Sequence, residues 1–94
     1  MATIVYGDFE WDDEKAATNA TKHGISFEEA STVFDDPSAL DAPDLLDPTR
    51  FVILGLSHRA RALFVVHAEQ GARIRIISAR KASPAQRKKY EEDT

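Results

Sequence analysis

The chain has 94 residues, of which 43% are hydrophobic, carries a formal net charge of −4 and contains no cysteine. This length predicts one domain over residues 1–94 with a modest core, and the lack of cysteine excludes disulfides and thiolate zinc sites. Residues 1–13 do not show the pattern of a signal peptide, and no apolar run approaches the roughly 18 residues that cross a bilayer. We therefore expect a cytoplasmic protein.

The charge is distributed unevenly along the chain. Residues 1–48 hold 12 acidic residues and two lysines, which gives −10, whereas residues 49–94 hold 10 basic and four acidic residues, which gives +6. The two halves can neutralise each other inside one domain, or the basic half can bind a polyanion. The distribution alone leaves both interpretations open.

The first half of the chain is predicted to form one strand and two helices. Residues 3–11 are rich in β-branched and aromatic side chains, which is typical of a strand. A helix then begins at the paired aspartates 12–13 and ends at Gly24, a residue that suits a helix C-terminus. Ser26 opens a second helix with the pattern of a capping box, and the sequence DDP at 35–37 ends that helix.

The second half is predicted to form an antiparallel sheet and a last helix. A short edge strand near residues 39–43 precedes three longer strands at 50–56, 61–68 and 73–79, and the short segments between them indicate hairpins. A serine–proline pair at 83–84 begins the last helix. The resulting order, β-α-α-β-β-β-β-α, predicts an α+β domain whose helices cover one face of the sheet.

The pairing of the last two long strands decides which side chains share a face. Gly71 suits a three-residue hairpin loop, which places His67 opposite Arg73 and diagonal to Arg75. A loop of two residues would separate these side chains. The three-residue loop is the better prediction because it also gathers an apolar core face of Phe64, Val66, Ile74 and Ile76.

Arg50 joins this cluster if His58 and Arg59 form a two-residue turn, because Arg50 then pairs with His67. Like charges that face one another destabilise a sheet. Such a cluster therefore predicts an anionic ligand, which is either an acidic partner or a phosphate backbone. Arg80 follows the last strand, so alternation does not fix its direction.

Three segments of the chain resemble the BrnT family of toxins from bacterial type II toxin–antitoxin systems. They are FEWDDEKAATNATKHGISFEEASTVFDDP (9–37), RFVILGLS (50–57) and RIRIISARKASPAQRKKYEE (73–92). The resemblance implies a compact relative of the RelE-type ribonucleases, with two helices before an antiparallel sheet. It also implies RNA cleavage, neutralisation by a BrnA antitoxin that carries a ribbon-helix-helix domain, and repression of the operon by the assembled hetero-oligomer, which contacts operator DNA through the antitoxin.

Cleavage of RNA without a metal or cofactor uses the ribose 2′-oxygen as nucleophile, a general base and acid, and cations that stabilise the charged phosphorane. The predicted catalytic residues, chosen by residue type, are His67, Arg75 and Arg80. The predicted RNA-binding residues are Arg50, Arg73, Lys22 and His23.

Each of these predictions has a structural alternative. His67 can simply end a strand on a solvated face, and Lys22 and His23 can only complement the dipole at the end of a helix. The basic run RKKY at 87–90 is either a solvated helix face or an extension of an RNA-binding track. The rival to a ribonuclease is a subunit without catalytic activity that binds an antitoxin or another DNA-binding partner.

Overall fold

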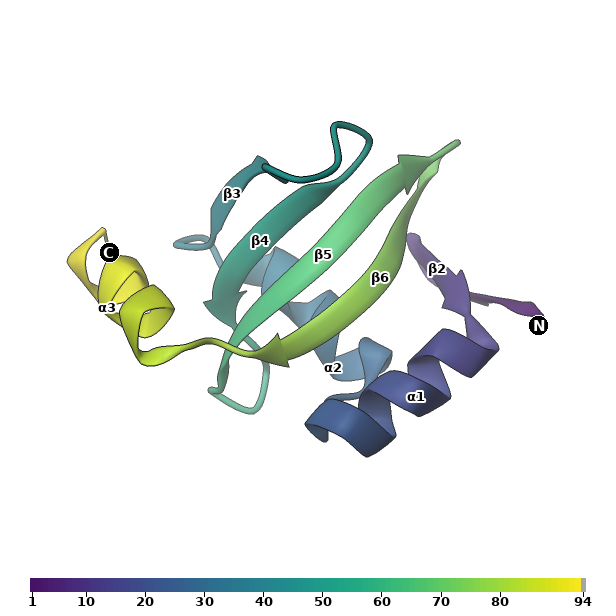
Figure 1. Ribbon diagram of the computed structural model, residues 1–94, viewed down its shortest axis with the longest axis horizontal. Coiled ribbons are helices and arrows are strands. Elements are labelled where there is room, and N and C mark those ends of the chain that lie inside the picture. The colour runs from purple at the N-terminus through teal and green to yellow at the C-terminus, as the bar shows by residue number, and fades with distance from the viewer. Residues whose placement is uncertain (94) are drawn as a thin grey trace.

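The computed structural model describes residues 1–93, which form a six-stranded sheet with three α-helices (Figure 1). The elements are β1 (Thr3–Tyr6), β2 (Phe9–Asp12), α1 (Asp13–His23), α2 (Phe27–Ser31), the 3₁₀ helix η1 (Thr32–Asp35), β3 (Leu40–Pro43), β4 (Phe51–Leu56), β5 (Ala62–Gln70), β6 (Arg73–Lys81) and α3 (Pro84–Glu92). The predicted α+β class is confirmed. None of the helices in this part of the chain is long and apolar enough to cross a membrane.

The predicted order of elements is wrong at the N-terminus, where residues 3–11 form a hairpin instead of one strand. Gly7 has a φ of +59°, a conformation that only glycine adopts readily, and it turns the chain between β1 and β2. β2 then pairs in parallel with β6, which gives the sheet order β1-β2-β6-β5-β4-β3. The observed order is therefore β-β-α-α-β-β-β-β-α, apart from the 3₁₀ helix.

The main core lies between the sheet and the first two helices, which Figure 1 shows together on one side of it. Its buried side chains are Trp11, Ile25, Phe27, Ala30, Val33, Ile53, Leu63, Val65, Ile76 and Ala79. α3 packs elsewhere, where Tyr90 and Ala82 form a small cluster with Leu54. We call the side of β4, β5 and β6 that faces away from the main core the open face, and α3 covers one end of it.

The register between β5 and β6 differs from the prediction. The strands are joined by a two-residue turn, so that Gln70 pairs with Arg73 and His67 pairs with Ile76 instead of Arg73. This shift of three residues is odd, so His67 no longer shares a face with Arg73 and Arg75. His67 therefore faces the main core together with Val65, and the predicted core face is wrong.

The register between β4 and β5 is also shifted, by one residue. Phe51, and not Arg50, pairs with His67, because the turn after β4 is longer than predicted. The backbone N–H of Ser57 donates to the carbonyl of Arg61, and Ala60 adopts a φ of +59° inside this turn. The predicted pairing of Arg50 with His67 is therefore wrong.

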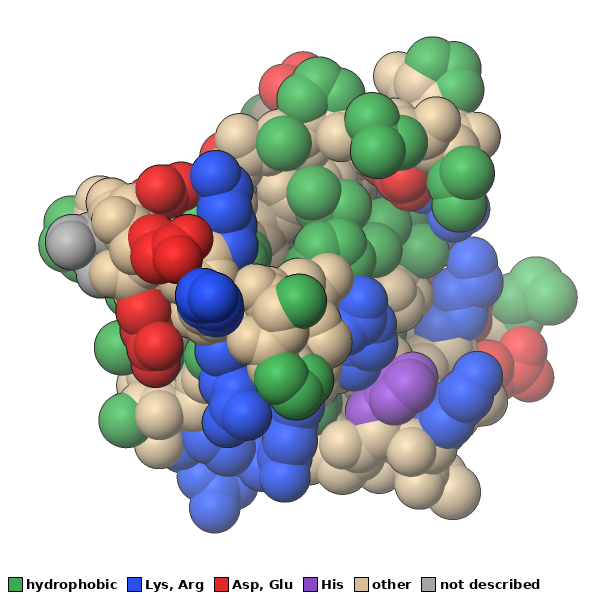
Figure 2. Space-filling model, turned by 60° about the vertical axis from the view of Figure 1, so that its left-hand side comes forward, with side chains coloured by type: hydrophobic (Ala, Val, Ile, Leu, Met, Phe, Trp, Pro, Cys, Tyr) green, Lys and Arg blue, Asp and Glu red, His purple; other side chains and the backbone are tan. Residues whose placement is uncertain are grey.

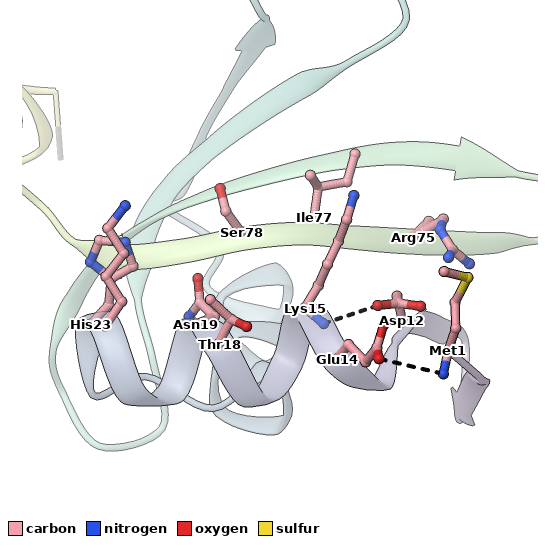
Figure 3. A pocket seen from close by; sticks show the side chains of 11 residues that line it. Met1, Asp12, Glu14, Lys15, Thr18, Asn19, His23, Arg75, Ile77 and Ser78 are labelled. Carbon is pink, nitrogen blue, oxygen red and sulfur yellow. Dashed lines mark hydrogen bonds and ion pairs between the residues drawn. The ribbon is translucent and has the colours of Figure 1, made fainter.

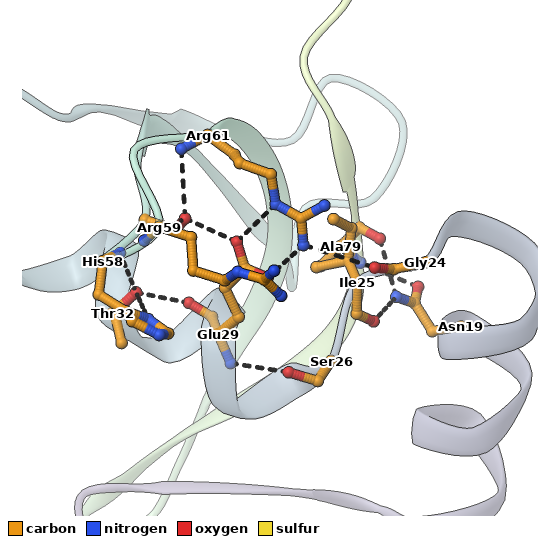
Figure 4. Close-up of polar contacts among 11 residues, drawn as sticks. Asn19, Gly24, Ile25, Ser26, Glu29, Thr32, His58, Arg59, Arg61 and Ala79 are labelled. Carbon is orange, nitrogen blue, oxygen red and sulfur yellow. Dashed lines mark hydrogen bonds and ion pairs between the residues drawn. The ribbon is translucent and has the colours of Figure 1, made fainter.

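Asn19 of α1 completes the edge of β6 beyond the point where β2 ends (Figure 4). Its side-chain amide donates to the carbonyls of Ala79 (2.8 Å) and Ile25 (2.9 Å), and its oxygen accepts from the N–H of Ala79 (3.0 Å). These bonds take the place of a neighbouring strand, since a buried backbone group without a partner costs about 1–3 kcal/mol. They also fix α1 alongside β6.

Candidate functional site

A groove of about 520 Å³ lies between α1 and β6 (Figure 3). Lys15, Lys22 and His23 line it from α1, and Arg75 and Ser78 line it from β6. The two lysines are seven residues apart, a spacing that puts them on one side of a helix. Four basic side chains from two elements therefore line the groove, together with the carboxylates of Asp12 and Glu14. Three of the predicted site residues are among its lining residues, with His23 and Lys22 toward one end and Arg75 at the other (Figure 3).

Arg75 is oriented by a carboxylate on the neighbouring strand. Glu10 lies directly opposite Arg75 in the β2–β6 pairing, and the arginine Nη1 donates to the glutamate Oε2 over 2.6 Å. Glu10 is buried, whereas Arg75 is partly exposed on the wall of the groove. A guanidinium has five N–H donors, so this ion pair leaves donors for an anion in the groove.

Arg80 lies on the open face next to the start of α3. Its guanidinium carbon is 4.5 Å from the centre of the Phe64 ring, its partner on β5. Nη1 donates to the side-chain oxygen of Gln86 (3.0 Å), a residue that also forms the capping box of α3. Gln86 in the first turn of α3 thus helps to hold Arg80 over the Phe64 ring. The face of an aromatic ring attracts a cation such as the guanidinium, which stabilises this position of Arg80.

The bulge in β6 brings its arginines onto one face. Ala68 pairs with Arg75 and Phe64 pairs with Arg80, although the two arginines are five positions apart, an odd spacing. Ile77 lies at the irregular step between them, and without it the alternation of side chains would place them on opposite faces. Figure 2 shows a face of the molecule on which Lys and Arg side chains border a hydrophobic patch, with a histidine among them.

His67 lies outside this site. It is buried, its ring is 4.8 Å from that of Phe34 and 5.9 Å from that of Phe51, and neither ring nitrogen has a hydrogen-bond partner. Burial lowers the pKa of His67, against the opposing effect of Asp41, whose carboxylate lies 3.8 Å from Nε2. His67 is thus neutral at pH 7 and separated from Arg73 and Arg75, so the predicted cluster is wrong.

The other predicted RNA-binding residues have different surroundings. Arg73 is exposed at the start of β6, where it pairs with Gln70 on the same face as Arg75. Arg50 lies in the loop before β4 and forms an ion pair with Asp47 (3.3 Å). Arg73 therefore joins Arg75 and Arg80 on the open face, and we call these three arginines the basic face. The charge of Arg50, in contrast, is partly neutralised within the loop.

Sequence reasoning missed Lys15, Glu10 and Phe64 as parts of the site. The helical spacing of Lys15 and Lys22 is a signal that the sequence contains. The place of Glu10 depends on the parallel pairing of β2 with β6, which has no local signal. Within residues 1–93 no group of three or more His, Asp or Glu side chains is arranged to hold a metal ion.

The fold and the groove define a small α+β protein with basic side chains along a surface groove and an open sheet face. The chain belongs to the BrnT family, since the family described as "Ribonuclease toxin, BrnT, of type II toxin-antitoxin system" matches residues 11–86. The crystal structure of the Brucella abortus ribonuclease toxin BrnT is similar, with a TM-score of 0.65 and 28% sequence identity over 78% of this chain and 92% of that chain. No curated protein sequence matches the chain.

These findings confirm the resemblance that the sequence indicated. The family is one of ribonuclease toxins, and a toxin of a type II system has a protein antitoxin as its partner. The similar crystal structure supports the same arrangement of helices and sheet.

Proposed function

We propose that this chain is an endoribonuclease that cleaves RNA without a metal ion. The ribose 2′-oxygen attacks the adjacent phosphorus, the bond from phosphorus to the 5′-oxygen breaks, and the products carry a 2′,3′-cyclic phosphate and a 5′-hydroxyl. The observation that supports the proposal is the groove between α1 and β6, which His23 lines at one end and Arg75 at the other, with Lys15 and Lys22 along α1 (Figure 3). These groups meet the need for proton transfer and for cations around the phosphate.

The roles follow from the position of each group. His23 exchanges protons with the 2′-oxygen or the leaving 5′-oxygen, because it is a histidine that lines the groove. Arg75 binds the cleaved phosphate and stabilises the charge of the phosphorane, and Arg80, five positions farther along β6, binds the RNA backbone beside it. The partly exposed ring of Phe64 can stack on a base, as aromatic side chains do in single-strand binding sites. His67 has no role in this proposal, because its ring is buried away from the groove.

The test is an RNA cleavage assay with the purified chain in excess EDTA. We expect cleavage that yields 2′,3′-cyclic phosphate ends, and we expect the double variant Arg75→Gln, Arg80→Gln, purified in the same way, to lose it. The double variant also reports contaminating nuclease. Equal cleavage by both proteins would refute the site, and no cleavage by the unaltered chain would favour a subunit that binds its antitoxin without catalysis.

The antitoxin partner is proposed to be a BrnA-like protein with a ribbon-helix-helix domain. It would form a hetero-oligomer with the toxin, cover the basic face, and carry the complex to operator DNA, so that the pair represses its own operon. This proposal is supported by the family, which requires a protein antitoxin, and by the basic face, which suits an acidic segment.

Expression of the chain alone is expected to arrest bacterial growth, and co-expression of a BrnA-like antitoxin is expected to relieve the arrest. Growth curves with a matched vector expressing the Arg75→Gln, Arg80→Gln variant provide the control. Normal growth of cells that accumulate the unaltered, folded chain would contradict the toxin proposal.

A further inference from the structure

A second groove, of about 660 Å³, lies between α3 and the ends of β4 and β5. Leu56 and Tyr90 form part of its wall, and three cationic side chains, Arg61, Lys81 and Arg87, line it. They come from the β4–β5 turn, the end of β6 and α3. A site lined from three separate elements depends on the tertiary fold and is more than a basic run on one helix.

The charges in this groove are not balanced. Glu91 is the carboxylate among its lining residues, against three cations. The guanidinium of Arg61 is bound to Glu29. Lys81 and Arg87, in contrast, form no ion pair with any residue of the part that the structure describes. Two exposed cations, Lys81 and Arg87, outnumber the carboxylate that lines the groove with them, and this excess of positive charge favours an anionic ligand.

The hydroxyl of Tyr90 is already used elsewhere. It donates to the carboxylate of Asp36 over 2.6 Å, and this bond raises the pKa of Tyr90 to about 12. The same carboxylate oxygen accepts from the backbone N–H of Leu56 (2.8 Å). Tyr90 therefore anchors α3 to the sheet, while Lys81 and Arg87 are left to bind a ligand.

β6 connects the two grooves. Arg75 and Ser78 line the groove beside α1, Lys81 lines the second groove, and Arg80 lies between them on the strand. Arg75 and Arg80 share the open face, whereas Lys81 pairs with the core residue Leu63 and so leaves β6 on the other face. A nucleic-acid strand that passes Arg75 and Arg80 therefore has to cross the end of β6 to reach Lys81 and Arg87 in the second groove.

We propose that the second groove is a separate phosphate subsite, which binds the RNA backbone on one side of the cleaved phosphate. This inference rests on the proposed function, because it assumes that the RNA crosses Arg75 and Arg80. Lys81 and Arg87 supply the contacts. The subsite adds affinity through the sequence-independent attraction of cations for phosphates, so it binds longer RNA strands without selecting their bases.

The probe is a fluorescent, single-stranded 2′-O-methyl RNA of about 12 nucleotides, a length within the usual range of single-strand sites. It has no free 2′-hydroxyl and is not cleaved, so binding is measured whether or not the chain is a ribonuclease. The variant is Lys81→Gln, Arg87→Gln. The control is Lys88→Gln, Lys89→Gln, which removes equal charge from exposed positions of α3 outside the groove. Arg61 is left unchanged because it forms the ion pair with the buried carboxylate of Glu29, and its loss would change the stability of the fold.

We expect the groove variant to bind the probe more weakly than the unaltered chain. The slope of log affinity against log salt concentration should also become smaller in magnitude by about 1.4, because two phosphate contacts are lost and each contributes about 0.7 on a single strand. The control is expected to keep the slope. Equal slopes in the unaltered chain and the groove variant would overturn the proposal. A second outcome would also overturn the proposal: an acidic peptide, such as oligoglutamate, binds the unaltered chain but not the groove variant, while RNA binds both equally. The groove would then be a site for protein and not for RNA.

The two proposals fail in different ways. Absence of cleavage, together with a reduced salt slope in the groove variant, would refute catalysis and leave the subsite standing. Cleavage by the unaltered chain, together with an unchanged slope, would refute the subsite alone.

Discussion

Replacement of His23 by alanine is expected to lower kcat/KM for RNA cleavage by about 10²–10⁴-fold, the usual contribution of a positioned general acid or base. His23 lies in the last turn of α1 and lines the same groove as Arg75 and Ser78. The measurement is the pH profile of cleavage in EDTA. The pH profiles of the two proteins should differ in shape, because the variant lacks the imidazole that exchanges the proton.

His67 provides the matched control for this prediction. His67→Phe is expected to leave cleavage within a few-fold of the unaltered chain and to keep or raise Tm. The ring of His67 contacts two phenylalanine rings, and its nitrogens are buried without partners. Removal of a buried polar group that makes no hydrogen bond relieves a desolvation cost of about 1–3 kcal/mol. Loss of cleavage in folded His67→Phe, with normal cleavage in His23→Ala, would reverse the assignment.

The features that sequence predicts well are those decided by neighbouring residues. Ser26 accepts a hydrogen bond from the N–H of Glu29, Ser83 forms a capping box with Gln86, and Gly24 ends α1 with a positive φ. Each of these helix ends depends on a few adjacent residues, so a local pattern is sufficient. The basic character of β6 is equally visible in the sequence.

Which side chains share a face of the sheet depends on how the strands pair, and the local sequence does not determine this pairing. Gly71 is compatible with two loop lengths, and Ile77 gives no sign of the bulge that brings Arg75 and Arg80 to one face. Since an odd error in register exchanges the faces, His67 was assigned to the wrong side. The role of Asn19 is still less predictable, because its partner Ala79 is 60 residues away. Contacts of this kind exist only after the fold has formed.

Replacement of Arg61 by methionine is expected to lower the free energy of unfolding, because it leaves the buried carboxylate of Glu29 without its cationic partner. The Glu29 carboxylate is 3% exposed and accepts hydrogen bonds from Arg61, through Nε at 2.9 Å and also through Nη2, and from the Ser57 hydroxyl at 2.6 Å (Figure 4). Methionine keeps much of the apolar stem, so the loss comes mainly from the unpaired carboxylate. Urea denaturation measures this loss of stability, with Arg73→Met, at an exposed position at the start of β6, as the control.

The loss should shrink in acid. In the native chain, the Arg61 hydrogen bond, assisted by Ser57, lowers the pKa of Glu29 below its ordinary value of 4.5. The stability that this provides is present above the unfolded pKa and is lost as the pH falls through the folded pKa. Without Arg61, burial instead favours the protonated carboxyl. The difference in stability between the two proteins should therefore be largest near pH 7 and decrease toward pH 4. A difference that stays constant over this range would show that lost packing, and not the buried charge, accounts for the effect.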